Sequence, residues 1–429
     1  MKERVRQTQI LPGLTLVSMR TGVKGIVSLG ASFLAGSRNT PKQELVCSVT
    51  AAMLKEGTRK YNKPELAEML DSKGIKISFS SSSTRTNVIA KIPTGELSQA
   101  IELFASMLTE PLFADNEFEI VKKRSIDQIL EQKEDTRARA SNLFLDKIYE
   151  SSHPNHEQSF DESISEVSNI KISALKNFHN QLYGLGSMII SAAGDVDHEQ
   201  LASLIRKSFT KTGRRSSSYA RESGKVKRLS KIGERNNILT MADKANVDLI
   251  MGHPIVIDIH SREYFALETA VEIMGGNDFG ARLLRIVREE NGLTYGISAK
   301  LGGLYYGDSG YLHIGGIFAP SLWQKGVEIT TKVVKDWASK GVTIKELARR
   351  KEMVRGEYLV QLSRSGGMEA ELLRLLEQDR SLDFLDEYPK LIASLTLKEV
   401  NTAIKKYIHP DQLITVAAGS IDEKGNPFK

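Results

Sequence analysis

The stretch ELVCSVTAAMLKEGT, residues 44–58, is the part of the sequence that decides the fold. Its apolar residues recur at helical spacing and Gly57 follows the last of them, so we predict an amphipathic helix over residues 44–56. Cys47 lies among apolar neighbours with no general base close in sequence, which indicates a buried structural thiol. The helix therefore has a face for the core, and it carries no histidine.

Length and composition are those of a multidomain globular protein. The chain has 429 residues, more than one hydrophobic core usually serves, so we expect at least two domains. Hydrophobic residues make up 40% and charged residues 26%, which is ordinary for a soluble protein. The N-terminus has no apolar leader, no run of about 18 apolar residues occurs, and the single cysteine fits a reducing compartment. We therefore expect a cytoplasmic protein that does not cross a membrane.

Positive charge is concentrated in one polar segment. Residues 206–231 contain ten Lys or Arg and one Glu, a local charge of +9, so the rest of the chain carries +6 − 9 = −3. The segment is rich in Ser and Gly and has no zinc-finger spacing, which favours a solvated linker over a nucleic-acid-binding arm. We predict an N-terminal domain over residues 1–208, a basic linker over 209–235 and a C-terminal domain over 236–429.

The two halves of the chain end alike. SMIISAAGDVD superimposes on QLITVAAGSID with Gly194 on Gly419, a shift of 419 − 194 = 225 residues. At the same shift, the helical pattern of residues 172–183 matches that of residues 397–408. Such a period indicates a duplicated domain, because solenoid repeats span about 20–50 residues.

Each half mixes strand and helix patterns with hairpins. In the first half, for example, the strand patterns at 75–83 and 87–92 are followed by helix patterns at 95–111 and about 116–135. We predict an α+β fold of two homologous domains, each a mostly antiparallel sheet backed by helices. A pocket between two such domains is the default candidate for a binding site.

A zinc site on a helix needs two imidazoles about one turn apart, and in H-x-x-E-H the Glu serves as general base. Residues 33–58, FLAGSRNTPKQELVCSVTAAMLKEGT, resemble the first domain of pitrilysin/insulinase-type zinc peptidases, which include the mitochondrial processing peptidase. In that frame the histidine positions fall on Ser48 and Ala52, the glutamate on Ala51, and the distal glutamate ligand on or near Gln128. These side chains are poor zinc ligands, so we expect no metal in this chain.

Other stretches extend the resemblance, and no histidine restores a metal site. Residues 151–167 resemble the family's HPYG segment and residues 342–374 its long C-terminal helix pair, so the likeness runs through nearly the whole chain. His153 and His156 lie in a proline turn, and His198 begins like a zinc-binding helix that lacks its second histidine. We expect these three to be surface or turn residues.

The second half follows the family best, in GGNDFGARLLRIVREENGLTYGISA (275–299). The resemblance implies that Arg288, near a helix end, and Tyr295, on the next strand, form a pair that holds substrate. The Asn-Gly at 291–292 predicts a left-handed helix stop, so both side chains could converge and donate to a peptide carbonyl. The alternative is that Arg288 pairs with a neighbouring glutamate in solvent and Tyr295 is a half-buried strand residue.

Three features of these segments are open to two interpretations. Asn277 or Asp278 is predicted to cap the helix start, where an anion-binding nest is the alternative. The serines at 80–83 replace the family's usual pattern on a strand that binds extended substrate, which argues against that use here. Three tyrosines could line the cavity or pack in the core: Tyr305, Tyr306 and Tyr311.

The resemblance implies a function that this chain cannot perform alone. We interpret it as the non-catalytic, substrate-binding subunit of a heterodimeric zinc metallopeptidase, with zinc held by a homologous partner that carries H-x-x-E-H. The two chains would enclose unfolded peptide as the halves of a clamshell, and the isolated chain could form a homodimer. The alternatives are a structural subunit, like the core proteins of the respiratory cytochrome complex, and a stand-alone peptide-binding protein. Neither nucleic acid nor a membrane is expected as a partner.

Overall fold

The computed structural model describes residues 1–40, 43–210, 235–304 and 309–428. The chain divides into two compact units, and each unit takes segments from both halves of the sequence. Unit 1 comprises Met1–Gln128, Asp161–Arg221 and Gly356–Tyr388; unit 2 comprises Ile129–Phe160, Glu222–Arg355 and Pro389–Lys429. The predicted basic linker lies almost wholly outside the described residues.

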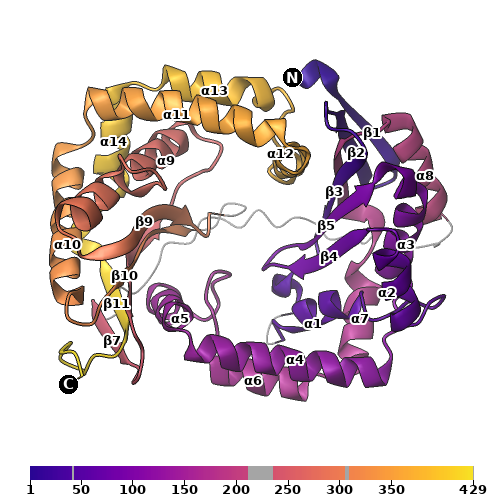
Figure 1. Cartoon of the computed structure of the whole chain (residues 1–429), viewed down its shortest axis with the longest axis horizontal. Coiled ribbons are helices and arrows are strands. Elements are labelled where there is room, and N and C mark those ends of the chain that lie inside the picture. The colour runs from indigo at the N-terminus through magenta and orange to yellow at the C-terminus, as the bar shows by residue number, and fades with distance from the viewer. Residues whose placement is uncertain (41–42, 211–234, 305–308, 429) are drawn as a thin grey trace. The chain divides into compact units, whose positions relative to one another are not determined.

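A six-stranded sheet forms the centre of unit 1, in the order β1-β2-β6-β3-β5-β4 (Figure 1). Neighbouring strands are antiparallel except β2 and β6, which are parallel. The strands are β1 (Val5–Leu11), β2 (Leu14–Arg20), β3 (Ile26–Phe33), β4 (Lys76–Ser81), β5 (Thr86–Pro93) and β6 (Met188–Gly194).

Helices cover both faces of this sheet to different extents. One face shares a hydrophobic core with α1 (Val46–Met53), α2 (Lys63–Asp71), α3 (Leu97–Thr109), α7 (Ile172–Leu182) and α8 (His198–Thr210). On the other face, α12 (Ser365–Glu377) packs against β2, β6 and β3. Figure 1 shows α3 and α8 on one side of the sheet and α12 on the other.

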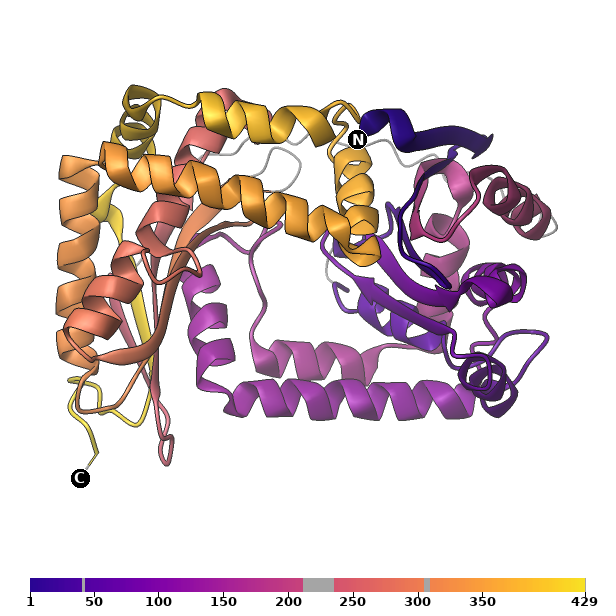
Figure 2. The same cartoon turned by 45° about the horizontal axis from the view of Figure 1, so that its top comes forward.

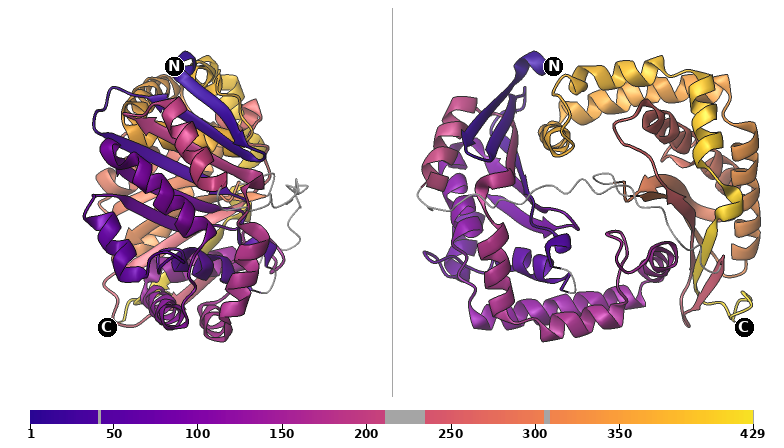
Figure 3. Two further views of the ribbon diagram at one scale, coloured as in Figure 1. Left: turned by 90° about the vertical axis from the view of Figure 1, so that its right-hand side faces the viewer. Right: turned by 180° about the vertical axis from the view of Figure 1, so that it is seen from behind.

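Unit 2 has a five-stranded sheet in the order β7-β11-β8-β10-β9. Only the β7–β11 pair is parallel. Its strands are β7 (Asn236–Thr240), β8 (Val247–Ile255), β9 (Thr294–Gly302), β10 (Gly310–Phe318) and β11 (Ile414–Gly419). The helices α9 (Arg262–Gly275), α10 (Trp323–Lys340) and α14 (Leu397–Tyr407) lie on one side of the sheet, and α5 (Thr136–Ile148) packs on β8 and β11 from the other (Figure 3).

The predicted α+β fold and its duplication are confirmed by the two sheets. The order β2-β6-β3-β5-β4 in unit 1 corresponds to β7-β11-β8-β10-β9 in unit 2, with the same parallel and antiparallel pairs. Gly194 and Gly419 end equivalent strands with φ of 133° and 157°. A Cβ on either would lie 2.3 or 2.4 Å from the carbonyl oxygen of Ile26 or Asn246, so both positions need glycine.

The helices α12 and α5 each cover a sheet of the unit formed mainly by the other half of the chain. The helices that lead to them are α11 (Ile344–Ser363) and α4 (Asp115–Glu134), and each contributes residues to both units. Lys122 of α4 donates to the Ser168 carbonyl of α6 (Phe160–Asn169) at 3.0 Å, so these helices run side by side (Figure 2). The last helix of this group, α13 (Phe384–Ser394), follows α12.

No helix within the described ranges is both long and apolar enough to cross a membrane. The helix predicted over 44–56 is shorter in the structure, as α1 from Val46 to Met53, and Gly57 follows it with φ of 115°.

Candidate functional site

Helix α1 packs into the core of unit 1 and carries no histidine and no carboxylate. Val46, Val49 and Met53 are each 1% exposed, because every third or fourth residue of the helix faces the sheet and its covering helices. Ser48 is exposed, and its hydroxyl donates to the Leu45 carbonyl at 2.9 Å. The hydroxyl therefore closes a turn of its own helix.

The other positions of the degenerate metal site also lack ligand chemistry. Ala51 is buried, Ala52 is half-buried, and Gln128 is exposed on α4. Over residues 1–40, 43–210, 235–304 and 309–428, no group of three or more His, Cys, Asp or Glu side chains could hold a metal ion. Cys47 is 3% exposed, and burial raises the pKa of its thiol, as expected for a structural cysteine.

A carboxylate that sequence reasoning missed lies just after α1. Glu56 is 6% exposed and is bound by Lys63 at 2.6 Å and by Arg124 at 3.3 Å. Two cations neutralise this carboxylate, so it stabilises the end of α1 against α2 and α4.

The histidines in suggestive spacings serve packing. His153 contacts the Ser309 hydroxyl at 2.9 Å and stacks on the Tyr149 ring, within unit 2. His156 lies 3.4 Å from Asp146. The ring of His198 bridges two hydroxyl groups of β1 and β2 at 2.8 Å each, and burial lowers its pKa. His198 begins α8 and is buried, so the expectation that it lies at the surface or in a turn is wrong.

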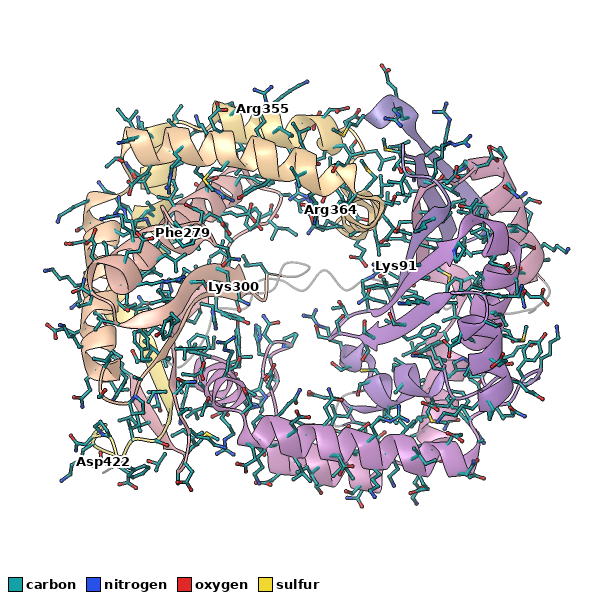
Figure 4. The ribbon with its side chains drawn as sticks, in the orientation of Figure 1. Lys91, Phe279, Lys300, Arg355, Arg364 and Asp422 are labelled. Atoms are coloured by element: carbon teal, nitrogen blue, oxygen red, sulfur yellow. The ribbon has the colours of Figure 1, made fainter. Side chains whose placement is uncertain are left out.

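Arg288 lies on a short π-helix, η5 (Leu284–Glu290), that leads into the edge strand β9. Gly292 ends this helix with φ of 63°, as predicted, and its N–H donates to the Arg288 carbonyl at 2.9 Å. The guanidinium lies 5.7 Å from the ring centroid of Phe279, which is 69% exposed on the preceding loop (Figure 4). Single-turn π-helical segments are frequent at functional sites.

Tyr295 stands in solvent at the start of β9, with 93% of its surface exposed. Glu290 pairs with Arg285, and within the described residues no ion pair or hydrogen bond occupies the side chain of Arg288 or Tyr295. The alternative of an Arg288–glutamate pair beside a half-buried tyrosine is therefore wrong. A free guanidinium and a free phenol remain on consecutive elements.

Asp278 and Tyr311, which the sequence left open to two interpretations, both have structural roles. Asp278 accepts a hydrogen bond from the Gly280 N–H at 2.8 Å and pairs with Arg349 at 3.1 Å, so a carboxylate occupies the helix start in place of an anion. Tyr311 packs edge-on against Phe144 of α5, with ring centroids 5.7 Å apart. Tyr305 and Tyr306 lie outside the described residues.

Strand β4 is the open edge of the unit 1 sheet, and the serines at 80–83 extend beyond its end. The carbonyls of Ser82 and Ser83 accept hydrogen bonds from the N–H groups of Ser37 and Arg38, at 3.2 and 2.9 Å. The last serines are thus engaged by the loop before α1, while the outer edge of residues 76–81 has no strand partner within the described part of the chain.

Two family models match this chain and together cover most of it. The model described as Insulinase (Peptidase family M16) matches residues 16–157, and the model described as Peptidase M16 inactive domain matches residues 169–354. An uncharacterized zinc protease of Mycobacterium tuberculosis is 23% identical over 404 residues, which cover 93% of this chain and 90% of the relative. A non-peptidase homolog of Helicobacter pylori, YmxG, is 22% identical over 388 residues, covering 89% and 86%.

Solved structures share the fold over nearly the full length. A peptidase M16 inactive domain from Pseudomonas fluorescens superimposes with a TM-score of 0.86 at 20% identity, covering 99% of this chain and 100% of that one. A chain of complex III2 from Candida albicans superimposes with a TM-score of 0.79 at 15% identity, covering 98% of each. No two histidines in the full sequence are four residues apart, so no H-x-x-E-H or H-E-x-x-H motif can form. The chain therefore belongs to peptidase family M16, and its helix α1 carries no histidine and no carboxylate.

Proposed function

We propose that this chain is the non-catalytic, substrate-binding subunit of a heterodimeric zinc metallopeptidase, in which a homologous subunit holds the zinc. Membership of the M16 family and the absence of the motif's two histidines and glutamate from α1 support the non-catalytic role. The H. pylori relative that bears the name non-peptidase homolog is similar over most of its length.

The main support for this role is that the Arg288 guanidinium and the Tyr295 hydroxyl, near the end of η5, are both available to donate hydrogen bonds. Arg288 keeps a permanent charge that no carboxylate of the described structure neutralises, and the Tyr295 hydroxyl is fully available to a ligand. Together they would hold the carbonyl of a bound peptide and donate to the negative charge that develops on its oxygen, while a zinc ion of the partner would supply the activated water. This role needs no metal in the present chain.

The test uses a complex of this chain with a homologue that carries an intact H-x-x-E-H motif. Arg288→Ala and Tyr295→Phe are each expected to lower kcat/KM for an unfolded peptide by about 100-fold, the usual loss for one oxyanion donor. Arg285→Ala is the matched control, because Arg285 lies on the same helix and is paired with Glu290. Unchanged turnover in both site variants would show that the pair has no such role.

Two other functions make different predictions in the same experiment. A structural subunit, suggested by the fold shared with a chain of complex III2, would occur in a stable assembly that is indifferent to Arg288 and Tyr295. A stand-alone peptide-binding protein would bind unfolded peptide without the partner. Zinc retained by the lone chain, together with proteolysis that a chelator abolishes, would contradict all three.

A further inference from the structure

Helix α12 covers only part of its face of the unit 1 sheet. It packs on β2, β6 and β3, where the carboxyl oxygen of Glu369 occupies the space that a Cβ on Gly30 would fill. The next strand, β5, continues the same face, and there Ile89 is 60% exposed although it lies opposite Gly30 in the register. The half of the sheet formed by β5 and β4 is therefore open.

The open half-sheet presents an apolar side chain beside a pair of lysines. Along β5, Val88, Ala90 and Ile92 point into the core, so Ile89 and Lys91 point to the open face. Figure 4 shows Lys91 on the side of the sheet away from α3 and α8.

Two lysines of this face are directly opposite each other across the strand pair. Lys76 on β4 is in register with Lys91 on β5, and both are exposed. Side chains directly opposite on antiparallel strands have Cβ atoms about 4.5–5.5 Å apart, and like charges there are unfavourable. On its other side Lys91 faces Ser28 of β3, so no acid lies beside it in the register.

Nothing in the described structure neutralises the two charges. Neither lysine makes an ion pair or a side-chain hydrogen bond within the described residues, and the sequences of β4 and β5, KISFSS and TNVIAKIP, contain no Asp or Glu. A lysine on an edge strand can serve to block strand pairing, which would account for Lys76. It does not account for Lys91, because β5 lies inside the sheet.

The second unit has a single exposed lysine at the corresponding pair of strands. Lys300 on β9 is exposed and lies in register opposite His313 of β10, and it also makes no ion pair within the described residues. By the sheet order, β9 and β10 correspond to β4 and β5. In unit 2 this face of β10 is covered by Phe144 of α5, which contacts the rings of Tyr311 and His313, so the open half-sheet is described for unit 1 alone.

We propose that the open face of β4 and β5 binds an extended, acidic segment of a peptide, with a carboxylate held between Lys76 and Lys91 and an apolar side chain on Ile89. In an extended segment, side chains two residues apart lie on one face, which matches the spacing of Ile89 and Lys91. One carboxylate accepts hydrogen bonds from both ammonium groups and removes their repulsion. This inference rests on the proposed function and names its substrate class, unfolded peptides rich in Asp and Glu.

The test measures fluorescence anisotropy of a labelled, unfolded peptide that alternates Glu with Leu, and of the same peptide with every Glu replaced by Gln. The full-length protein is compared with Lys76→Gln, Lys91→Gln and the double variant. The double variant is expected to bind the Glu peptide about tenfold more weakly, from the loss of two exposed charge contacts, with the Gln peptide unaffected. Its thermal unfolding temperature should be equal or higher, because a like-charge pair is removed.

The matched control removes the same charge from another surface. Lys176 of α7 and Lys207 of α8 are exposed and make no ion pair within the described residues, so Lys176→Gln/Lys207→Gln should weaken binding less than twofold. Equal weakening in the control, equal loss of both peptides in the double variant, or tighter binding of a single-stranded oligonucleotide to the same lysines would overturn the inference.

The same proteins separate this inference from the proposed function. If a zinc-bearing partner cleaves Glu and Gln peptides equally well with this chain, the acidic specificity is wrong and the subunit role stands. If the chain binds acidic peptide through these lysines but does not change the partner's turnover, the peptide-binding site on β4 and β5 is confirmed and the subunit role is wrong.

Discussion

Glu369 is the buried acid whose removal gives the sharpest test of how α12 is seated on the unit 1 sheet. Its side chain is 5% exposed, and it accepts a hydrogen bond from the Ser191 hydroxyl at 2.5 Å. Burial, assisted by the charge of Glu377 and opposed by the Ser191 hydrogen bond, raises the pKa of Glu369 to about 7.

The raised pKa determines whether the stability of the folded state rises or falls with pH. In the unfolded chain Glu369 loses its proton near its ordinary pKa of 4.5, while the folded protein keeps the proton until about pH 7. The folded state therefore binds more protons between these values, and its stability falls as the pH rises from about 4.5 to 7 and levels off above that. The total is about 3 kcal/mol, since one pKa unit corresponds to about 1.4 kcal/mol.

Glu369→Gln removes this titration and keeps an acceptor for Ser191. The variant should gain about 2.5 kcal/mol relative to the parent on going from pH 5 to pH 8. Native-state hydrogen exchange of peptides from α12 and β6 measures this difference in stability at the contact between the helix and the sheet. Both tryptophans, Trp323 and Trp337, belong to unit 2, so their fluorescence in urea should show no such change.

The control for this variant is Glu68→Gln, at an exposed position of α2 in the same unit. It should have the same effect on stability at both pH values. If Glu369→Gln is equally stabilising or destabilising at pH 5 and pH 8, Glu369 is charged throughout this range and the account of its burial is refuted.

Two further predictions concern backbone strain and acid stability. Gly194→Ala and Gly419→Ala should each destabilise their own unit by more than about 1 kcal/mol, because each combines a positive φ with a Cβ clash; urea unfolding would contradict this if both matched the parent. Burial lowers the pKa of His253 and of His313 to about 4, so unit 2 should lose about 2–3 kcal/mol for each histidine as the pH falls from 7 to 4.5, because the unfolded imidazoles take up protons near pH 6.5 first. Tryptophan fluorescence in urea measures this loss, and a flat profile over that range would show that neither histidine is buried in its neutral form.

Several structural features were readable in the sequence because they depend on neighbours along the chain. The periodicity of residues 44–56 predicted α1, although the structure shortens it at both ends. The 225-residue repeat predicted two equivalent sheets, and the sheet order confirms them. The left-handed stop at Gly292 followed from the Asn-Gly pair. The same stop places Arg288 and Tyr295 on consecutive elements, the helix η5 and the strand β9.

The sequence by itself determined the repeated α+β unit, the family and the loss of zinc ligands, because periodicity, turn glycines and side-chain chemistry are local properties. Only the tertiary structure decided that α5 and α12 each cover a sheet of the unit built mainly from the other half of the chain. That exchange buries Glu369 over Gly30 and leaves Lys76 and Lys91 on the open half of a sheet. The physical reason is that the burial of a charged side chain depends on which helix packs on which strand, and the sequence of one helix or one strand does not record its distant neighbour.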